Sequence, residues 1–255
     1  MATQSANVHD TRFRNGDTVI AAQLHLPPGF DACRRWSALV LSTPGRHIQP
    51  TMDARYASKL AARGFVVIAF DCLHRDANGD ATRAAATSAW RADDLHCAVD
   101  HLVSLPFVDA RQIGVLGICA GGGPAARAAL TDPRVKALAT VAGTDAGGTF
   151  RRLLARRRRH EARPQLRGIA PVRDGSPLQD LPDRLLQPLM VIVGSRHGGT
   201  RQHETGRALY GLARGRDQAL VVIPDADPDG LARRDEHIDP AINRLAPFFH
   251  FHLEP

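Results

Sequence analysis

The chain has 255 residues, 44% of them hydrophobic, which is enough to build one α/β domain with a full core, and we expect a single domain. No apolar run reaches the roughly 20 residues of a membrane-spanning helix, and the first residues lack the basic and apolar parts of a signal peptide; we expect a soluble cytoplasmic protein without membrane contact. The formal net charge of +7 comes almost entirely from arginine and is not arranged in basic stripes, which argues against a nucleic-acid partner.

The predicted elements begin with a hairpin. Residues 8–14 and 18–26 alternate in polarity around Asn15-Gly16, a strong hairpin signal, and predict an antiparallel edge. Residues 65–70 form an uninterrupted β-branched and aromatic run, typical of a parallel strand buried on both faces. The other expected strands are residues 37–42, 113–118, 135–141, 189–193 and 219–223. The expected helices are residues 52–63, 87–105, 125–130, 202–213 and 240–252.

This alternation of strands and helices predicts right-handed βαβ units and a doubly wound, mostly parallel sheet with helices on both faces. The loops at the carboxyl ends of the strands should build the site. Residues 143–187 are rich in glycine, arginine and proline and too long for an ordinary connection, so we predict a cap over the pocket. The basic run 151–160 within this segment has no interleaved aromatic residues, and we interpret it as a solvated helix face or lid.

The cysteines are far apart in the sequence. Cys33, Cys72, Cys97 and Cys119 form no C-x-x-C pair, so neither a disulfide framework nor a thiolate zinc site is indicated. We expect reduced thiols and neither a metal nor a cofactor.

One of these cysteines lies at a predicted turn between strand and helix. Residues 113–123 read as an apolar strand, a glycine-flanked turn that carries Cys119, and the start of a helix. The helix macrodipole should lower the pKa of the Cys119 thiol, and the Ala120 N–H is the obvious first donor to an oxyanion. The alternative is that Cys119 is a small buried residue beside a tight turn.

The order of elements and the sequence Gly117-Ile118-Cys119-Ala120-Gly121-Gly122 resemble the α/β-hydrolase superfamily, and within it the dienelactone-hydrolase-like group, whose nucleophile turn is G-x-C-x-G-G. The likeness covers residues 8–253 and includes the motifs Asp132-Pro133-Arg134 and Phe248-Phe249. The resemblance implies an eight-stranded α/β-hydrolase fold. It also implies a catalytic triad in the order nucleophile, acid and histidine, in which the histidine moves protons and the acid holds its tautomer.

Two positions of this implied triad are substituted. The family histidine falls on Pro228, and the family acid falls in residues 194–200, which contain no carboxylate. His237 is a substitute about nine residues further on, or else a surface residue at the start of the last helix. Asp145 stands where some α/β-hydrolases keep their acid, or else serves the turn.

Other polar residues follow the last two strands. His197 and His203 could approach the sulfur from the side of the missing acid, or hold ordinary loop positions. Asp225, Asp227 and Asp229 cap or shape a polar loop, or accept protons directly.

The loops after the third and fourth strands offer further site residues. The second oxyanion donor should be Gly45 or Arg46, because Pro44 has no N–H. Arg75 matches the place of an arginine that helps dienelactone hydrolases bind a substrate carboxylate, or is a solvated loop residue. His47, His74 and His197 are expected to line the substrate site by their position.

These residues predict a metal-free enzyme that acts on an ester, lactone, thioester or related carbonyl compound through Cys119. Because no base is evident, one alternative is a non-hydrolytic acyl transferase, cyclase or bond-forming catalyst of secondary metabolism. The other is an inactive ligand-binding protein on the same scaffold. In each case the partner is a small molecule, and the chain is a monomer or a homodimer.

Overall fold

The computed structural model describes residues 7–43, 50–70, 88–144, 155, 185–196, 198, 200–215 and 217–254. The predicted cap and its basic run therefore lie almost wholly outside the described residues. No helix in the described ranges is long and apolar enough to span a bilayer.

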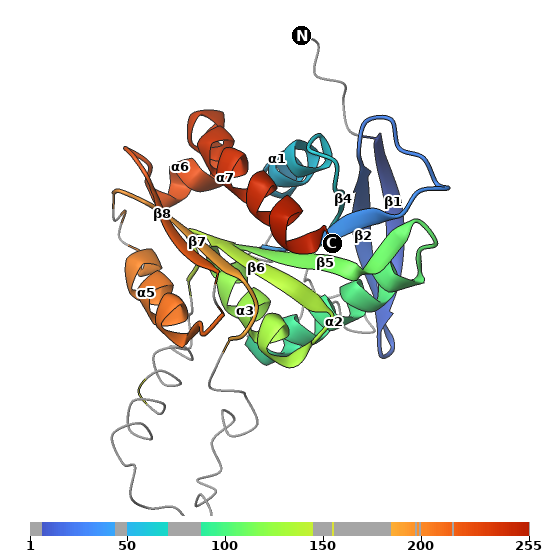
Figure 1. Ribbon diagram of the computed structural model, residues 1–255, viewed down its shortest axis with the longest axis horizontal. Helices are drawn as coiled ribbons and strands as arrows, with labels where there is room; N and C mark the ends of the chain where they lie inside the picture. The colour runs from blue at the N-terminus through green and yellow to red at the C-terminus, as the bar shows by residue number, and fades with distance from the viewer. Residues whose placement is uncertain are drawn as a thin grey trace, which may run out of the picture.

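A twisted sheet of eight strands runs through the described part of the chain in the order β1-β2-β4-β3-β5-β6-β7-β8 (Figure 1). Neighbouring strands from β4 to β8 run parallel, whereas β1 and β2 pair antiparallel with each other and β2 pairs antiparallel with β4. This confirms the predicted eight-stranded, mostly parallel sheet. The strands are β1 (Asn7–Asn15), β2 (Thr18–Leu26), β3 (Trp36–Ser42), β4 (Val66–Phe70), β5 (Val108–Ile118), β6 (Val135–Val141), β7 (Leu189–Gly194) and β8 (Gln218–Ile223).

The first two strands form the predicted hairpin at one edge of the sheet. Asn15 pairs with Thr18 across the turn, and Gly16 has a φ of +55°, a left-handed conformation that glycine adopts without steric cost. The two-residue turn sets the register of the whole hairpin, so that Phe13 and Ile20 are paired and both buried.

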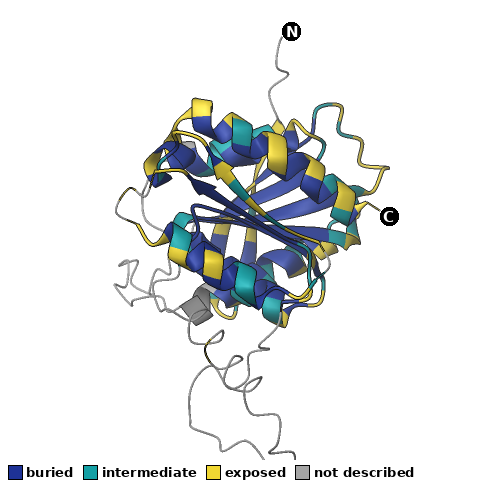
Figure 2. Cartoon of the chain, turned by 60° about the vertical axis from the view of Figure 1, so that its left-hand side comes forward, coloured by how far each residue is buried: buried dark blue, intermediate teal, exposed yellow. Residues whose placement is uncertain are grey.

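Helices cover both faces of the sheet, with their buried sides turned inward (Figure 2). One layer contains α1 (Pro50–Ala61), α6 (Pro228–Arg233) and α7 (Asp235–Leu253). The other contains α2 (Ser88–Ser104), α3 (Gly122–Thr131) and α5 (Gln202–Leu212). The two apolar clusters, one on each face of the sheet, form the core.

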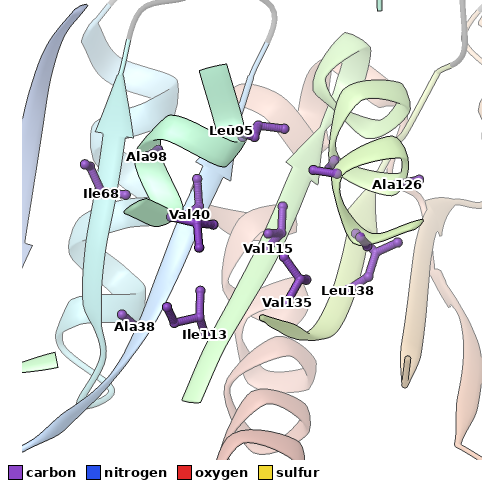
Figure 3. Close-up of a cluster of buried hydrophobic side chains, with 14 of the residues drawn as sticks. Ala38, Val40, Ile68, Leu95, Ala98, Ile113, Val115, Ala126, Val135 and Leu138 are labelled. Carbon is purple, nitrogen blue, oxygen red and sulfur yellow. The ribbon is translucent and has the colours of Figure 1, made fainter. Parts of the chain in front are cut away.

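Strand β5 lies in the middle of the sheet and contacts both layers. Figure 3 shows Ile113 and Val115 in the cluster beneath α2 and α3. Gly114 points to the other face, where an added Cβ would lie 2.8 Å from Cε1 of Phe249 in α7. Gly117 faces α3, where an added Cβ would lie 2.7 Å from the Ala125 Cβ. Glycine at these positions lets a helix approach the strand closely on either side.

The carboxyl-terminal region differs from the prediction. The last helix was expected from residue 240, but α7 begins at Asp235, and the short helix α6 before it was not predicted. Asp227 caps α6 and Pro228 occupies its first turn, where the missing N–H costs no hydrogen bond. Pro240 lies inside α7, where it removes only the hydrogen bond to the carbonyl of the exposed residue Glu236.

The contact between Gly114 and Phe249 gives a test of the packing. Gly114→Ala should lower the free energy of unfolding by ~1–3 kcal/mol because its Cβ overpacks a fully buried site. In a Phe249→Leu background the same change should cost less, since the overlapping ring atoms are gone. Urea unfolding of both single variants and the double variant measures the coupling, and strictly additive costs would contradict this packing.

Candidate active site

The turn around Cys119 has an uncommon backbone conformation. Strand β5 ends at Ile118, a single 3-10 turn covers Cys119–Gly121, and α3 follows at Gly122. Cys119 has a φ of +49°, in the left-handed region that non-glycine residues rarely adopt. The N–H groups of Gly122 and Thr144 both donate to the Cys119 carbonyl, the latter at 2.8 Å. The predicted strand, sharp turn and helix are confirmed, and tertiary contacts hold the turn in place.

Three segments of backbone meet at this turn because the residues between them are glycines. A Cβ on Gly121 would overlap the carbonyl oxygen of Ser42, at the end of β3. One on Gly122 would lie 2.8 Å from the Gly143 Cα, in the segment after β6. The ends of β3 and β6 and the start of α3 therefore form one tightly packed unit around Cys119. Ala120 lies in the 3-10 turn that precedes α3.

The Cys119 side chain is partly buried and packs against the apolar cluster beneath α1, α6 and α7. In that cluster the fully buried Tyr56 hydroxyl donates a hydrogen bond of 2.7 Å to the Leu231 carbonyl. This bond ties α1 to α6 beside the sulfur. Cys119 is thus neither a fully buried core residue nor an open surface thiol.

The electrostatic surroundings of the thiol contradict one prediction. The pKa of Cys119 is raised from the ordinary value of 9.0 to about 11; burial is the largest cause, the charge of Asp229 acts in the same direction, and the charge of Arg233 opposes the rise. Asp229 and Arg233 form an ion pair of 2.8 Å along one face of α6. The predicted lowering of this pKa by the start of α3 was wrong, because removal from water outweighs the partial charge of a helix end. At neutral pH the group is a thiol.

His237 lies in the first turn of α7 and is only 9% exposed, so the alternative of a surface residue was wrong. Its ring packs over Gly230 of α6, where an added Cβ would overlap Nδ1, and among the described residues that buried nitrogen has no hydrogen-bond partner. Nε2 lies 3.9 Å from Oε1 of Glu236. No hydrogen bond joins His237 to Cys119 within the described residues, and a catalytic role for His237 stays a prediction.

The loops after β7 and β8 pack against each other. A Cβ on Gly198 would lie 2.5 Å from Cδ of Pro228, so the expected places of the family acid and histidine are neighbours in space. Asp227 accepts a hydrogen bond of 2.6 Å from the Gly230 N–H, which supports its interpretation as a cap. Asp225 has a φ of +55° and pairs with Arg196 at 3.3 Å.

The contacts of His203 agree with the second of its two predicted alternatives, an ordinary loop position. Its Nε2 lies 2.9 Å from the Gly194 carbonyl oxygen, at the end of β7. Beside it the buried side chain of Gln202 accepts from the Gly194 N–H and donates to the Arg196 carbonyl. These contacts hold the chain where it leaves β7.

The remaining candidate residues lie outside the described part of the chain, and their proposed roles stay predictions: Gly45, Arg46, His47, His74, Arg75, Asp145 and His197. Among the described residues, no group of three or more His, Cys, Asp or Glu side chains could hold a metal ion. Sequence reasoning gave no site role to Tyr56 or Arg233. The available signal for Arg233 was weak, an i,i+4 spacing of opposite charges with Asp229, and no sequence signal indicated that Tyr56 is buried.

Comparisons with known proteins agree with the fold. Residues 36–160 match the Dienelactone hydrolase family. The crystal structure of PA2218 from Pseudomonas aeruginosa superposes with a TM-score of 0.72 at 23% identity, covering 97% of this chain and 94% of that one. The chain has the α/β-hydrolase fold. The dienelactone hydrolase of Anabaena variabilis shares it, with a TM-score of 0.70 at 16% identity over 98% of this chain and 99% of that one.

A curated relative covers part of the chain. The Escherichia coli K12 protein YcjY is 38% identical over 141 residues, which are 55% of this chain and 46% of YcjY. The chain therefore spans less than half of the length of YcjY.

The raised pKa predicts how Cys119 reacts with iodoacetamide. The thiolate is the reactive form, so the alkylation rate of Cys119 should rise about tenfold per pH unit between pH 8 and pH 10 and level off near the pKa of about 11. The alkylation reaction is quenched at a series of times, and peptide mass spectrometry of the quenched samples gives the rate at Cys119. A plateau already at pH 8 would show that the pKa is not raised.

The ion pair on α6 predicts opposite effects of two substitutions. Asp229→Asn removes a negative charge near the sulfur and should lower the pKa of Cys119, which speeds alkylation at pH 8 severalfold. Arg233→Gln should raise that pKa and slow alkylation. Changes of the same sign in both variants would instead indicate an altered access to the sulfur.

Proposed function

We propose that this chain is a dienelactone-hydrolase-like enzyme that attacks the carbonyl carbon of an ester, lactone or thioester through Cys119. The observation that carries the proposal is the left-handed conformation of Cys119 at the end of the central strand, held by backbone contacts at Gly121 and Gly122. The match of residues 36–160 to the Dienelactone hydrolase family supports the same chemistry.

In the proposed reaction the Cys119 sulfur forms a bond to the carbonyl carbon, and the carbonyl oxygen takes up the displaced electron pair. The Ala120 N–H and a second amide at Gly45 or Arg46 donate hydrogen bonds to this oxyanion. Collapse of the intermediate expels the alcohol or thiol, which takes a proton, and leaves an acyl group on Cys119. Attack by water then releases the acid and restores the thiol.

The proton of the thiol needs an acceptor. With a pKa of about 11, only about one Cys119 in ten thousand is ionised at pH 7. Asp229 is the described carboxylate whose charge acts on Cys119, and it fits the role of base best. His237 and Asp145 remain further candidates for the proton transfers, and His197 for the lining of the site. If Asp229 is the base, Asp229→Asn should speed alkylation of Cys119 and slow turnover in the same preparation.

Two arginines support a proposal for the substrate class. Arg233 lies close enough to act on Cys119, and Arg75 is placed by the resemblance where an arginine binds a carboxylate. His47 and His74 are proposed to line the same side of the site. We therefore propose a small carbonyl substrate that carries an acidic group, in a cytoplasmic protein without nucleic-acid or membrane contact, with residues 143–187 as its cap.

A second candidate is a non-hydrolytic acyl transferase, cyclase or bond-forming catalyst of secondary metabolism. One observation favours it: no imidazole in the described ranges hydrogen-bonds to Cys119, so no described histidine is placed to activate water against an acyl intermediate. In that case an acyl group would stay on Cys119 until a specific acceptor arrives. A third candidate is a protein with the same site that binds a ligand but does not catalyse a reaction.

The experiment is turnover of p-nitrophenyl acetate and of a short acyl thioester by the wild-type chain, Cys119→Ser and Cys119→Ala. Hydrolysis through Cys119 predicts turnover that falls by 100-fold or more in Cys119→Ala. Cys33→Ala, at an exposed cysteine between β2 and β3, is the matched control and should keep most of the rate. A stoichiometric acyl adduct without turnover would favour the second candidate. No adduct and no alkylation, with tight ligand binding, would overturn the enzymatic proposal.

A further inference from the structure

Helix α6 is held beside Cys119 by a hydrogen bond from outside the helix. It has only six residues, and the Arg234 N–H that follows it donates to the Gly230 carbonyl. The next carbonyl, that of Leu231, lies in the last turn, where a helix has no N–H group of its own to offer. The buried hydroxyl of Tyr56, in α1, donates to that oxygen at 2.7 Å. This hydroxyl therefore completes the last turn of α6.

Helix α1, which carries Tyr56, is itself joined to α7 in the same layer (Figure 1). Polar side chains at intervals of four residues, along α1 and just beyond its end, meet side chains with the same spacing on α7. A single exposed ion pair contributes little, but three pairs in one register fix how the two helices lie along each other. The pairs are Arg55 with Asp235 at 2.7 Å, Lys59 with Asp239 at 2.5 Å and Arg63 with Asn243 at 2.6 Å.

The bond at Leu231 lies at the centre of the part of α6 that acts on the thiol. Leu231 is midway between Asp229 and Arg233, the two residues of α6 whose charges act on Cys119. Their side chains form an ion pair of 2.8 Å across one turn of the helix. Leu231 and Ala232 belong to the apolar cluster against which the sulfur packs. A shift of α6 would therefore move both charges and open the sulfur to water.

The Tyr56 hydroxyl is near enough to Cys119 for the charge of the thiolate to act on it, but it is not suited to accept the thiol proton. Burial raises the pKa of Tyr56, and the charge of Cys119 raises it too, so the hydroxyl stays protonated. Its proton forms the bond to the Leu231 carbonyl. In this state the hydroxyl is a donor that holds α6.

We propose that Tyr56 is a positioning residue, whose hydroxyl keeps α6 in the place where Asp229 and Arg233 act on Cys119. In this role Tyr56 acts through the helix and touches no reacting atom. Its expected effect on turnover rests on the proposed function, in which Asp229 accepts the thiol proton. Its expected effect on the alkylation of Cys119 does not depend on that function.

The first test measures the alkylation of Cys119 by iodoacetamide from pH 8 to pH 10 in the wild type, Tyr56→Phe, Asp229→Asn and the double variant. Phenylalanine keeps the buried ring, so that only the hydrogen bond is lost. Tyr56→Phe should speed alkylation at pH 8 severalfold, because water reaches the sulfur when α6 loosens. Adding Asp229→Asn to Tyr56→Phe should then change the rate by less than about twofold, because the charge no longer has a fixed place.

Tyr210→Phe is the matched control for this test. Tyr210 is the only other tyrosine of the chain and lies in α5, on the opposite face of the sheet. Its substitution should leave both the alkylation rate and the effect of Asp229→Asn unchanged. If Tyr56→Phe unfolds at a lower urea concentration but keeps the wild-type pH profile, Tyr56 serves stability alone and the proposal is wrong. An Asp229→Asn effect of the same size with and without Tyr56→Phe would also overturn it.

The second test follows hydrogen exchange by mass spectrometry and turnover of p-nitrophenyl acetate in the same preparations. In Tyr56→Phe, peptides that cover residues 228–233 should exchange faster, whereas peptides of β3 and α3 keep their rates. Turnover should fall about tenfold, because the base is misplaced. Unchanged exchange in α6 would overturn the proposal. Faster exchange and alkylation in a chain without any turnover would support it and would count against the proposed function alone.

Discussion

The close approach of three backbone segments at Cys119 is the constraint on which the rest of the site depends. Gly121 touches the end of β3, Gly122 touches the segment after β6, and Gly117 lets α3 pack against β5. Each contact leaves no room for a side chain. Together they hold Cys119 at a positive φ, which non-glycine residues rarely adopt, at the carboxyl end of the central strand.

The same packing sets the protonation state of the thiol. A helix start offers a partial positive charge, but the sulfur also loses contact with water and lies near Asp229. Desolvation is the largest of these effects, so the pKa rises although the turn has the form of a nucleophile site. In the proposed reaction a cysteine in this state needs a base, and Asp229 and Arg233 on α6 are the charged groups that act on its pKa.

Helix α6 links the thiol to the end of the sheet. It is capped by Asp227, tied to α1 through the Tyr56 hydrogen bond, and covered on its inner side by His237. The loop after β7 packs against its first residue, Pro228. The place where the resemblance implies a histidine is therefore the start of a short helix, and this helix puts charged side chains beside the sulfur. The polar loop after β8 has become a structural element of the site.

The sequence by itself determined the order of strands and helices, the hairpin at Asn15-Gly16, the turn at Cys119 and the resemblance to the α/β-hydrolases. These features depend on local patterns: polarity that alternates along a strand, β-branched runs, and glycines on both sides of one cysteine. It could not determine the start of α7 at Asp235, because Asp225 to Gly230 reads as a polar turn until tertiary packing makes Asp227 a cap. Only the tertiary structure decided the burial of His237 and the raised pKa of Cys119. Both result from distant segments that exclude water from these side chains, and no window of sequence records which segments those will be.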